Sequence, residues 1–140
     1  MANVLPAKMF LLSVQKAENE LRIISARKRH YNDLIAAIGA NMRPVVVQTS
    51  GNSSKVETAA IGLVDLVEKL SAKERDYVAL VQKAEALIDT LPQTKFREVL
   101  KRKYLAGESW KTIRDEMGYK DEKSVFRCHG YALKELQKLM

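Results

Sequence analysis

The chain has 140 residues, enough for one ordinary domain or two small ones, and a formal net charge of +7. Its single cysteine, Cys128, excludes an internal disulfide framework, and its two histidines lie too far apart in sequence for the ligand spacing of a zinc site. There is also no apolar run long enough to span a bilayer, and the start lacks the basic segment and cleavage site of a signal peptide. We therefore expect a soluble cytoplasmic protein with no cofactor, no metal and no membrane partner.

Two long segments in the first two thirds repeat apolar residues in alternating steps of four and three. The first series is Phe10, Val14, Ala17, Leu21, Ile24, Lys28, Tyr31, Ile35 and Ile38. The second is Val56, Ala60, Leu63, Val67, Leu70, Glu74, Tyr77, Val81, Ala84, Ile88 and Leu91. This spacing is typical of coiled-coil helices. It predicts an antiparallel helical hairpin within residues 1–91, with one helix over about 7–38 and another over about 55–90.

The stretch between the two series predicts a loop near residues 39–54. It contains Gly39, Pro44 and a run of small polar residues from Thr49 to Ser54. Ser54, with Glu57 three residues later, has the pattern of a helix-capping box. Lys28 and Glu74, which interrupt the two series, either form a polar pair that sets the register or lie at the helix edges. Each apolar seam is narrow, so a homo-oligomer formed through the hairpin is a further hypothesis.

Residues 92–140 predict three shorter helices and hold most of the positive charge, with 12 Lys and Arg against 7 Asp and Glu, compared with 12 against 10 in residues 1–91. A helix over 94–105 ends near Gly107, a second over 110–117 begins after Ser109, and a third runs from Asp121 to about 139. Their inward faces are expected to hold Phe96, Val99, Leu100, Tyr104, Trp110, Ile113, Met117, Val125, Cys128, Ala132, Leu133 and Leu136. The basic excess suits a polyanion such as DNA, although it also suits a well-solvated surface.

A short helix, a tight turn with Gly118 and a longer basic helix form the pattern of a helix-turn-helix, in which the second helix enters the major groove. A small helical bundle with a basic surface is the alternative. Arg127 can pair bidentately with guanine, and Phe126 can contact a thymine methyl group. The expected base-reading residues are Lys123, Ser124, Phe126 and Arg127. The expected phosphate contacts are Lys111, Thr112, Lys120 and His129, with help from free backbone N–H groups at the start of the shorter helix.

The motifs Arg97–Leu100, Tyr104–Ile113, Met117–Tyr119 and Ser124–Arg127 resemble region four of bacterial sigma factors, and His129–Leu136 resembles phage regulators of the ArpU and RinA kind. The closer resemblance covers roughly residues 50–140. It implies a phage or prophage transcriptional regulator in a bacterial host cell, often an activator of late genes, which can contact RNA polymerase. One departure is Arg114, where such proteins commonly have alanine. That arginine must reach solvent, which puts the details of the reading geometry in doubt.

Two other functions compete with this interpretation. Small terminase proteins, which recognise DNA for packaging, also join a helix-turn-helix to coiled-coil helices, but usually carry the helix-turn-helix first. A coiled-coil adaptor that binds another protein is the second alternative. An enzyme is not expected, because the sequence offers no phosphate-binding loop, metal set or activated nucleophile. Cys128 falls on an apolar helix face and is expected to be a buried structural thiol.

Overall fold

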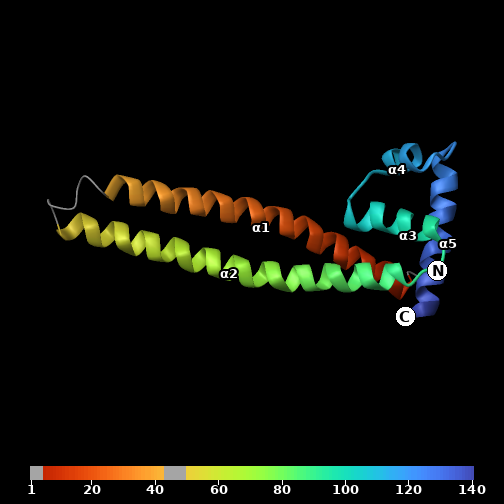
Figure 1. Cartoon of the computed structure of the whole chain (residues 1–140), viewed down its shortest axis with the longest axis horizontal. Coiled ribbons are helices and arrows are strands. Elements are labelled where there is room, and N and C mark those ends of the chain that lie inside the picture. Colours follow the sequence, from red (N-terminus) through yellow and green to blue (C-terminus); the bar gives the residue numbers. More distant parts are fainter. Residues whose placement is uncertain (1–4, 43–49) are drawn as a thin grey trace. The chain divides into compact units, whose positions relative to one another are not determined.

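The computed structural model describes residues 5–42 and 50–140, and all of the regular structure in these ranges is helical (Figure 1). The elements are α1 (Pro6–Met42), α2 (Ser50–Asp89), α3 (Thr94–Leu100), the π-helical turn η1 (Lys101–Leu105), α4 (Trp110–Met117) and α5 (Glu122–Leu139). The predicted all-α class is therefore confirmed. Within the described ranges, no helix combines the length and apolarity needed to cross a membrane.

The predicted loop at 39–54 is too long at both ends. Helix α1 continues through Gly39 to Met42, and α2 already begins at Ser50. Ser54 is therefore helical, and the predicted N-cap at this residue is wrong. Glycine and serine weaken a helix interior by about 1 kcal/mol or less per residue, which neighbouring turns can offset. The predicted break at Pro44 lies outside the described residues.

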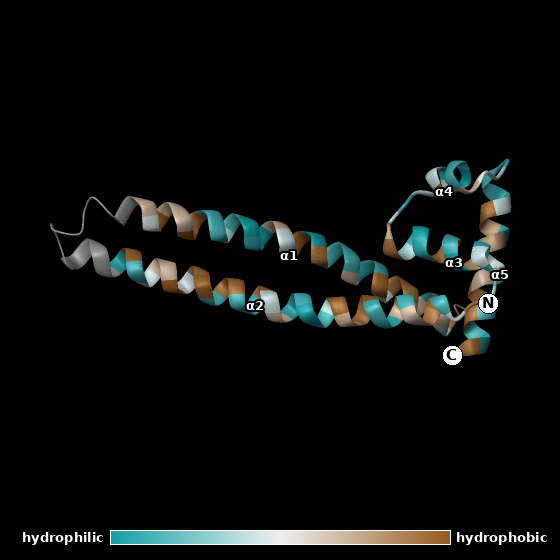
Figure 2. Ribbon diagram, in the orientation of Figure 1, coloured by the Kyte–Doolittle hydropathy of each residue, from teal (hydrophilic) through white to brown (hydrophobic). Residues whose placement is uncertain are grey.

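The chain divides into two compact units, of which the second comprises Glu20–Tyr77. In this unit α1 and α2 run side by side (Figure 1), and Figure 2 shows hydrophobic and hydrophilic positions interspersed along both helices. All of the predicted seam residues in this unit are buried or half-buried, and Ile24 and Leu70 are the most deeply buried of them. The predicted spacing therefore picks out the covered side of each helix.

Lys28 and Glu74, the two charged residues in the seams, meet each other. Lys28 Nζ lies 3.1 Å from Glu74 Oε1, and both side chains are half-buried. Of the two predicted interpretations, this contact favours a polar pair over two residues at helix edges. A charged pair at this position disfavours shifted pairings of the two helices, since a one-turn slip would place each charge against an apolar side chain.

The first unit combines the described part of Met1–Asn19 with Val78–Met140. Its core contains residues of both chain segments, namely Ala7, Leu11, Ile88, Leu91, Phe96, Val99, Leu100, Tyr104, Ile113, Val125, Cys128, Ala132, Leu133 and Leu136. The core therefore crosses the predicted boundary between residues 91 and 92. The physical reason is size, because about fifty residues form only a small core by themselves, and the residues of α1 and α2 enlarge it.

Two hydrogen bonds tie the start of α1 to the C-terminal helices within this unit. The Ala7 backbone N–H donates to Gln137 Oε1 of α5 at 2.8 Å, and Gln15 Nε2 of α1 donates to the Lys103 carbonyl of η1 at 3.0 Å. The Ala7 N–H belongs to the first turn of α1 and the Lys103 carbonyl to an irregular turn, and such backbone groups need partners outside the helix ladder, here supplied by glutamine side chains. The first turns of α1 thus complete the C-terminal helices rather than standing apart from them.

The predicted helix over 94–105 is present, but its last turn is a π-helix. The Ala106 N–H donates to the Lys101 carbonyl at 2.9 Å, five residues back. Arg102 holds this turn by reaching Glu98 and Glu108, each at 3.0 Å. Gly107 then leaves the helix with φ of 68°, a left-handed conformation that favours glycine, as predicted for the helix end.

Candidate nucleic-acid interface

Helices α4 and α5 begin at the predicted capping residues. Ser109 Oγ accepts the Thr112 N–H at 3.1 Å, and Asp121 Oδ1 accepts the Ser124 N–H at 2.9 Å. Between the helices, Gly118 has φ of 75°, and the Tyr119 N–H donates back to the Arg114 carbonyl at 2.9 Å. These local bonds satisfy helix-end groups and make the turn abrupt. The predicted caps and the predicted turn are confirmed.

The side chains that join α4 to α5 are aromatic and aliphatic. Ile113 and Val125 are fully buried. The Trp110 ring makes edge contacts with Phe126, at 5.0 Å between centroids, and with His129, at 4.9 Å. Such edge-to-face contacts fix ring orientation in addition to burying area. Helix α5 therefore starts at a defined angle to α4, with its opposite side exposed.

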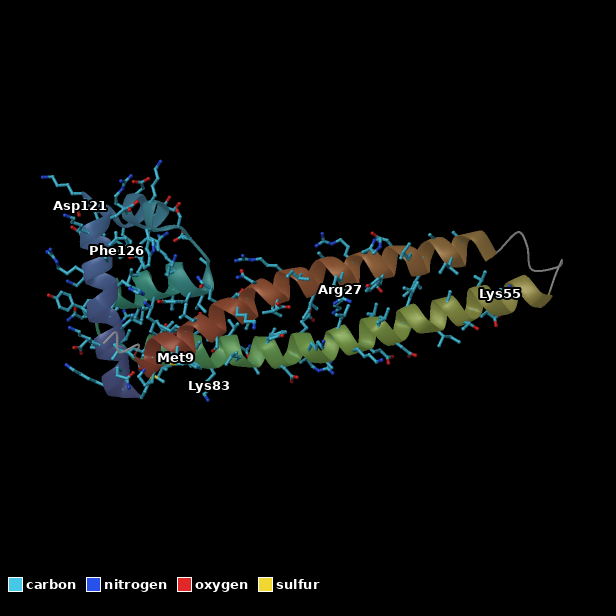
Figure 3. The ribbon with its side chains drawn as sticks, turned by 180° about the vertical axis from the view of Figure 1, so that it is seen from behind. Met9, Arg27, Lys55, Lys83, Asp121 and Phe126 are labelled. Atoms are coloured by element: carbon cyan, nitrogen blue, oxygen red, sulfur yellow. The ribbon has the colours of Figure 1, made fainter. Side chains whose placement is uncertain are left out.

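Four cations follow one exposed face of α5, and we call them the basic stripe. They are Lys123, Arg127, Lys134 and Lys138, spaced by four, seven and four residues. This spacing places them on one helical face. Figure 3 shows nitrogen-tipped side chains projecting from the outer side of α5. The two carboxylates of this helix, Glu122 and Glu135, lie at positions beside the stripe. Glu135 pairs with Lys138 at 3.0 Å, and the charges of Lys123 and Arg127 act on the exposed Asp121 carboxylate, whose pKa they help to lower after the hydrogen bonds from Ser124.

The structure separates the four predicted base-reading residues into two groups. Lys123 and Arg127 are exposed members of the basic stripe. Ser124 is half-buried and its hydroxyl donates to Asp121 Oδ1 at 2.9 Å, so its side chain serves the helix cap. Phe126 is 45% exposed, but its ring packs against Trp110 on the side of α5 that faces α4. Only Lys123 and Arg127 extend fully from the outer face.

Lys111, Thr112 and Lys120, three of the predicted phosphate contacts, are exposed on α4 and the following turn. Lys111 and Lys120 can reach a phosphate as point charges. Thr112 differs, because both its N–H and its hydroxyl bond to Ser109 Oγ, the hydroxyl at 2.9 Å. The expected free N–H at this position is therefore absent, since the N-cap already uses it.

The prediction that His129 contacts phosphate is wrong. Its side chain is buried, and Nε2 lies 2.7 Å from the hydroxyl of Tyr104. Burial, with smaller contributions from the charges of Lys8 and Lys103, lowers the pKa of His129 to about 4. Burial likewise raises the pKa of Tyr104 to about 12. The pair is therefore neutral at pH 7 and joins η1 to α5 inside the core.

This buried imidazole predicts a loss of stability in mild acid. In the unfolded chain the pKa is near 6.5, so between pH 6.5 and 4 the unfolded state binds more protons than the folded state. We expect the His129 contribution to the free energy of unfolding to be fully present above about pH 7.5 and to fall by about 3 kcal/mol as the pH drops to 4. Urea unfolding at successive pH values measures this.

The matched control for that experiment is His129→Gln, which keeps a hydrogen-bonding side chain but cannot titrate. Subtracting its profile from that of the original chain removes the contribution of every other group. A difference that stays constant between pH 4 and 7 would contradict the assignment.

Two other expectations concern single residues. Cys128 is buried, as predicted for a structural thiol, and its Sγ lies 3.9 Å from the Lys95 carbonyl. Arg114 is half-buried and reaches Asp115 Oδ1 through Nε at 3.0 Å and Nη2 at 2.9 Å. The arginine thus extends along the exterior of α4, which lets a cation occupy a position near the packed side of the helix.

Sequence reasoning missed Lys134 and Lys138 because it considered only the first turns of the last helix. The feature that could have identified them is their spacing from Arg127, which follows the helical period and puts them on the same face.

Within the described ranges, no cluster of three His, Cys, Asp or Glu side chains is arranged to hold a metal ion. The exposed surface of α4, α5 and their turn therefore offers cations, with the carboxylates of Asp115, Glu116, Asp121 and Glu122 between them.

Comparisons with protein-family models, curated proteins and solved structures found no match to this chain.

Proposed function

We propose that this chain is a sequence-specific, double-stranded DNA-binding regulator of transcription. The observation that carries the proposal is the basic stripe, which lies on the exposed face of an 18-residue helix braced by α4. A single α-helix fits the major groove, and cations near its start can reach guanine edges while others meet phosphates. In this arrangement Lys123 and Arg127 contact bases, and Lys111, Lys120 and Lys134 contact the backbone.

The two long helices supply the second part of the proposal. We infer an antiparallel coiled-coil hairpin, supported by the covered seams and by the Lys28–Glu74 pair. Its exposed side includes Ile61 and Val64, one helical turn apart and 62% and 42% exposed, and this favours pairing with a second copy. A dimer would place two copies of α5 on two half-sites, which is the usual way such modules gain specificity.

The resemblance to sigma region four and to regulators of the ArpU and RinA kind favours transcription in a phage or prophage over other uses of DNA. Contact with RNA polymerase and activation of late genes follow from that resemblance. The rival function, recognition of DNA for packaging, would require a closed ring of many subunits. Sedimentation of the full chain separates the two, because a monomer or dimer fits a regulator and a large ring fits packaging.

The direct test is selection from a fragmented phage-bearing bacterial genome, in which bound fragments are sequenced over a series of salt concentrations. We expect enrichment of one or a few sites, with affinity falling steeply as salt rises because bound cations release counterions. Uniform weak binding to all fragments, or none, would contradict a sequence-specific regulator.

Lys111→Gln tests the backbone role of α4. We expect affinity to fall by a similar factor for the selected site and for unrelated DNA, and the slope of log affinity against log salt to flatten by about 0.9. Fluorescence anisotropy at several salt concentrations measures both. The control is Lys73→Gln, an exposed lysine on α2, which should leave the slope unchanged. A loss confined to the selected site would instead make Lys111 a base contact.

A further inference from the structure

A small pocket of 230 Å³ lies beside the first turns of α5, between that helix, the start of α3 and the turn after α4. Phe96 and Cys128 line it, and both are buried, so they form its floor. The remaining lining residues are polar, namely Lys95, Tyr119, Ser124, Arg127 and Tyr131. The proposed DNA-reading surface uses only Arg127 and, at its margin, Ser124.

The polar lining is dominated by hydrogen-bond donors and positive charge. Lys95 and Arg127 can only donate, and the carboxylate of Asp121, which borders the lining, is occupied by the N–H and hydroxyl of Ser124. Lys95 Nζ lies 5.5 Å from the centre of the Phe96 ring, so the ammonium group is close to the pocket floor. The Tyr131 side chain is 52% exposed at the rim. This combination suits a small anion with several oxygen atoms.

Two further features restrict the class of ligand that the pocket can bind. A hydrogen bond to Cys128, followed by burial, raises the pKa of Tyr119 to about 12, so its hydroxyl stays protonated and adds no negative charge. Ser124 donates its hydroxyl hydrogen to Asp121, which leaves Lys95, Arg127 and Tyr131 as the main donors.

We propose that this pocket binds a phosphate group, and that in the complex the group is one phosphodiester of the DNA backbone. The inference rests on the proposed DNA-binding function and adds a fixed anchor to it. Arg127 belongs both to the basic stripe and to the pocket, so a phosphate held here lies next to the base-reading side chains. Phosphate contacts of this kind set the register of a recognition helix in the groove. Lys95 and Tyr131, which the sequence patterns did not single out, become DNA-positioning residues.

The variant that tests the pocket is Lys95→Gln, which removes the charge but keeps a stem over Phe96. Its matched control is Lys83→Gln, an exposed lysine of α2 in the same compact unit and distant in sequence from the pocket residues. Each protein is titrated against a selected DNA duplex in which successive phosphates are replaced, one at a time, by uncharged methylphosphonate. Lys95 is exposed, so neither substitution should alter the fold, and circular dichroism checks this.

We expect one phosphate whose neutralisation weakens the original chain and Lys83→Gln by about threefold to tenfold, and weakens Lys95→Gln by a clearly smaller factor, because only Arg127 and Tyr131 still contact it. Tyr131→Phe, which lacks only the hydroxyl group, should reduce the loss at that same phosphate. If the original chain binds DNA but all variants show the same losses at every phosphate, the pocket is not a phosphate site, while the proposed function stands.

A second experiment tests the pocket without DNA, in case the chain does not bind DNA at all. Amide NMR signals of Tyr119, Ser124 and Tyr131 are followed as inorganic phosphate is added. Shifts that Lys95→Gln abolishes would support a phosphate pocket that serves a carrier other than DNA. Absence of both DNA binding and these shifts would overturn the pocket and the proposed function together.

Discussion

Replacing Arg127 by alanine is expected to weaken binding to the selected DNA site by about 1–3 kcal/mol, roughly fivefold to 150-fold, while leaving the fold intact. The side chain is exposed on the outer face of α5 and close to its start, where recognition helices contact base edges. A guanidinium group can donate two parallel hydrogen bonds to guanine, and the alanine variant loses both. Binding to the selected site and to a scrambled duplex, compared by anisotropy, measures the effect.

The conservative variant Arg127→Lys separates charge from geometry. Lysine keeps the positive charge but cannot form the planar two-bond contact. We expect affinity for the scrambled duplex to be nearly preserved and discrimination against it to fall. Arg75→Ala, an exposed arginine of α2, is the control for a general loss of charge. Equal affinity of Arg127→Ala and Arg75→Ala for the selected site would refute the base-reading role.

The second large effect is on stability and concerns α1. Leu11 is fully buried in the same core as Val125 and Leu136, whereas its neighbour Leu12 is 44% exposed. We expect Leu11→Ala to lower the free energy of unfolding by about 2–5 kcal/mol, because a buried cavity replaces the side chain. Leu12→Ala removes the same atoms from an exposed position and should cost well under 1 kcal/mol.

The fluorescence of Trp110 is the readout of this experiment, because Trp110 is the single tryptophan and lies in α4, about one hundred residues from the substitution. If α1 and the C-terminal helices share one cooperative core, the fluorescence transition in urea shifts to lower concentration in Leu11→Ala and remains in place in Leu12→Ala. An unchanged Trp110 transition in both variants would mean that residues 92–140 fold by themselves. The C-terminal helices would then need nothing from α1.

The features that the sequence predicted well are those set by neighbours in the chain. Seam spacing identified the covered residues of α1 and α2, including Lys28 and Glu74, because helical periodicity brings every third or fourth residue to one face. The caps at Ser109 and Asp121 and the turn at Gly118 were predicted because each depends on bonds within about five residues. Helix-turn-helix function and phage origin remain predictions that the DNA selection tests.

The features that the sequence could not predict depend on which segments meet. His129 looked like a surface residue until α3 and η1 brought Tyr104 to its ring nitrogen. The core across residues 91 and 92, and the pocket that joins Lys95 to Arg127, likewise combine residues far apart in sequence.

By itself, then, the sequence determined the helical class, the positions of the C-terminal helices, their caps and the concentration of positive charge after residue 91, since all of these follow from local spacing and composition. Only the tertiary structure decided that α1 completes the C-terminal core, that His129 is buried and neutral, and that a pocket lined by Lys95 and Arg127 adjoins α5. The physical reason is that burial and pKa depend on the atoms packed around a group, and those atoms come from distant parts of the chain.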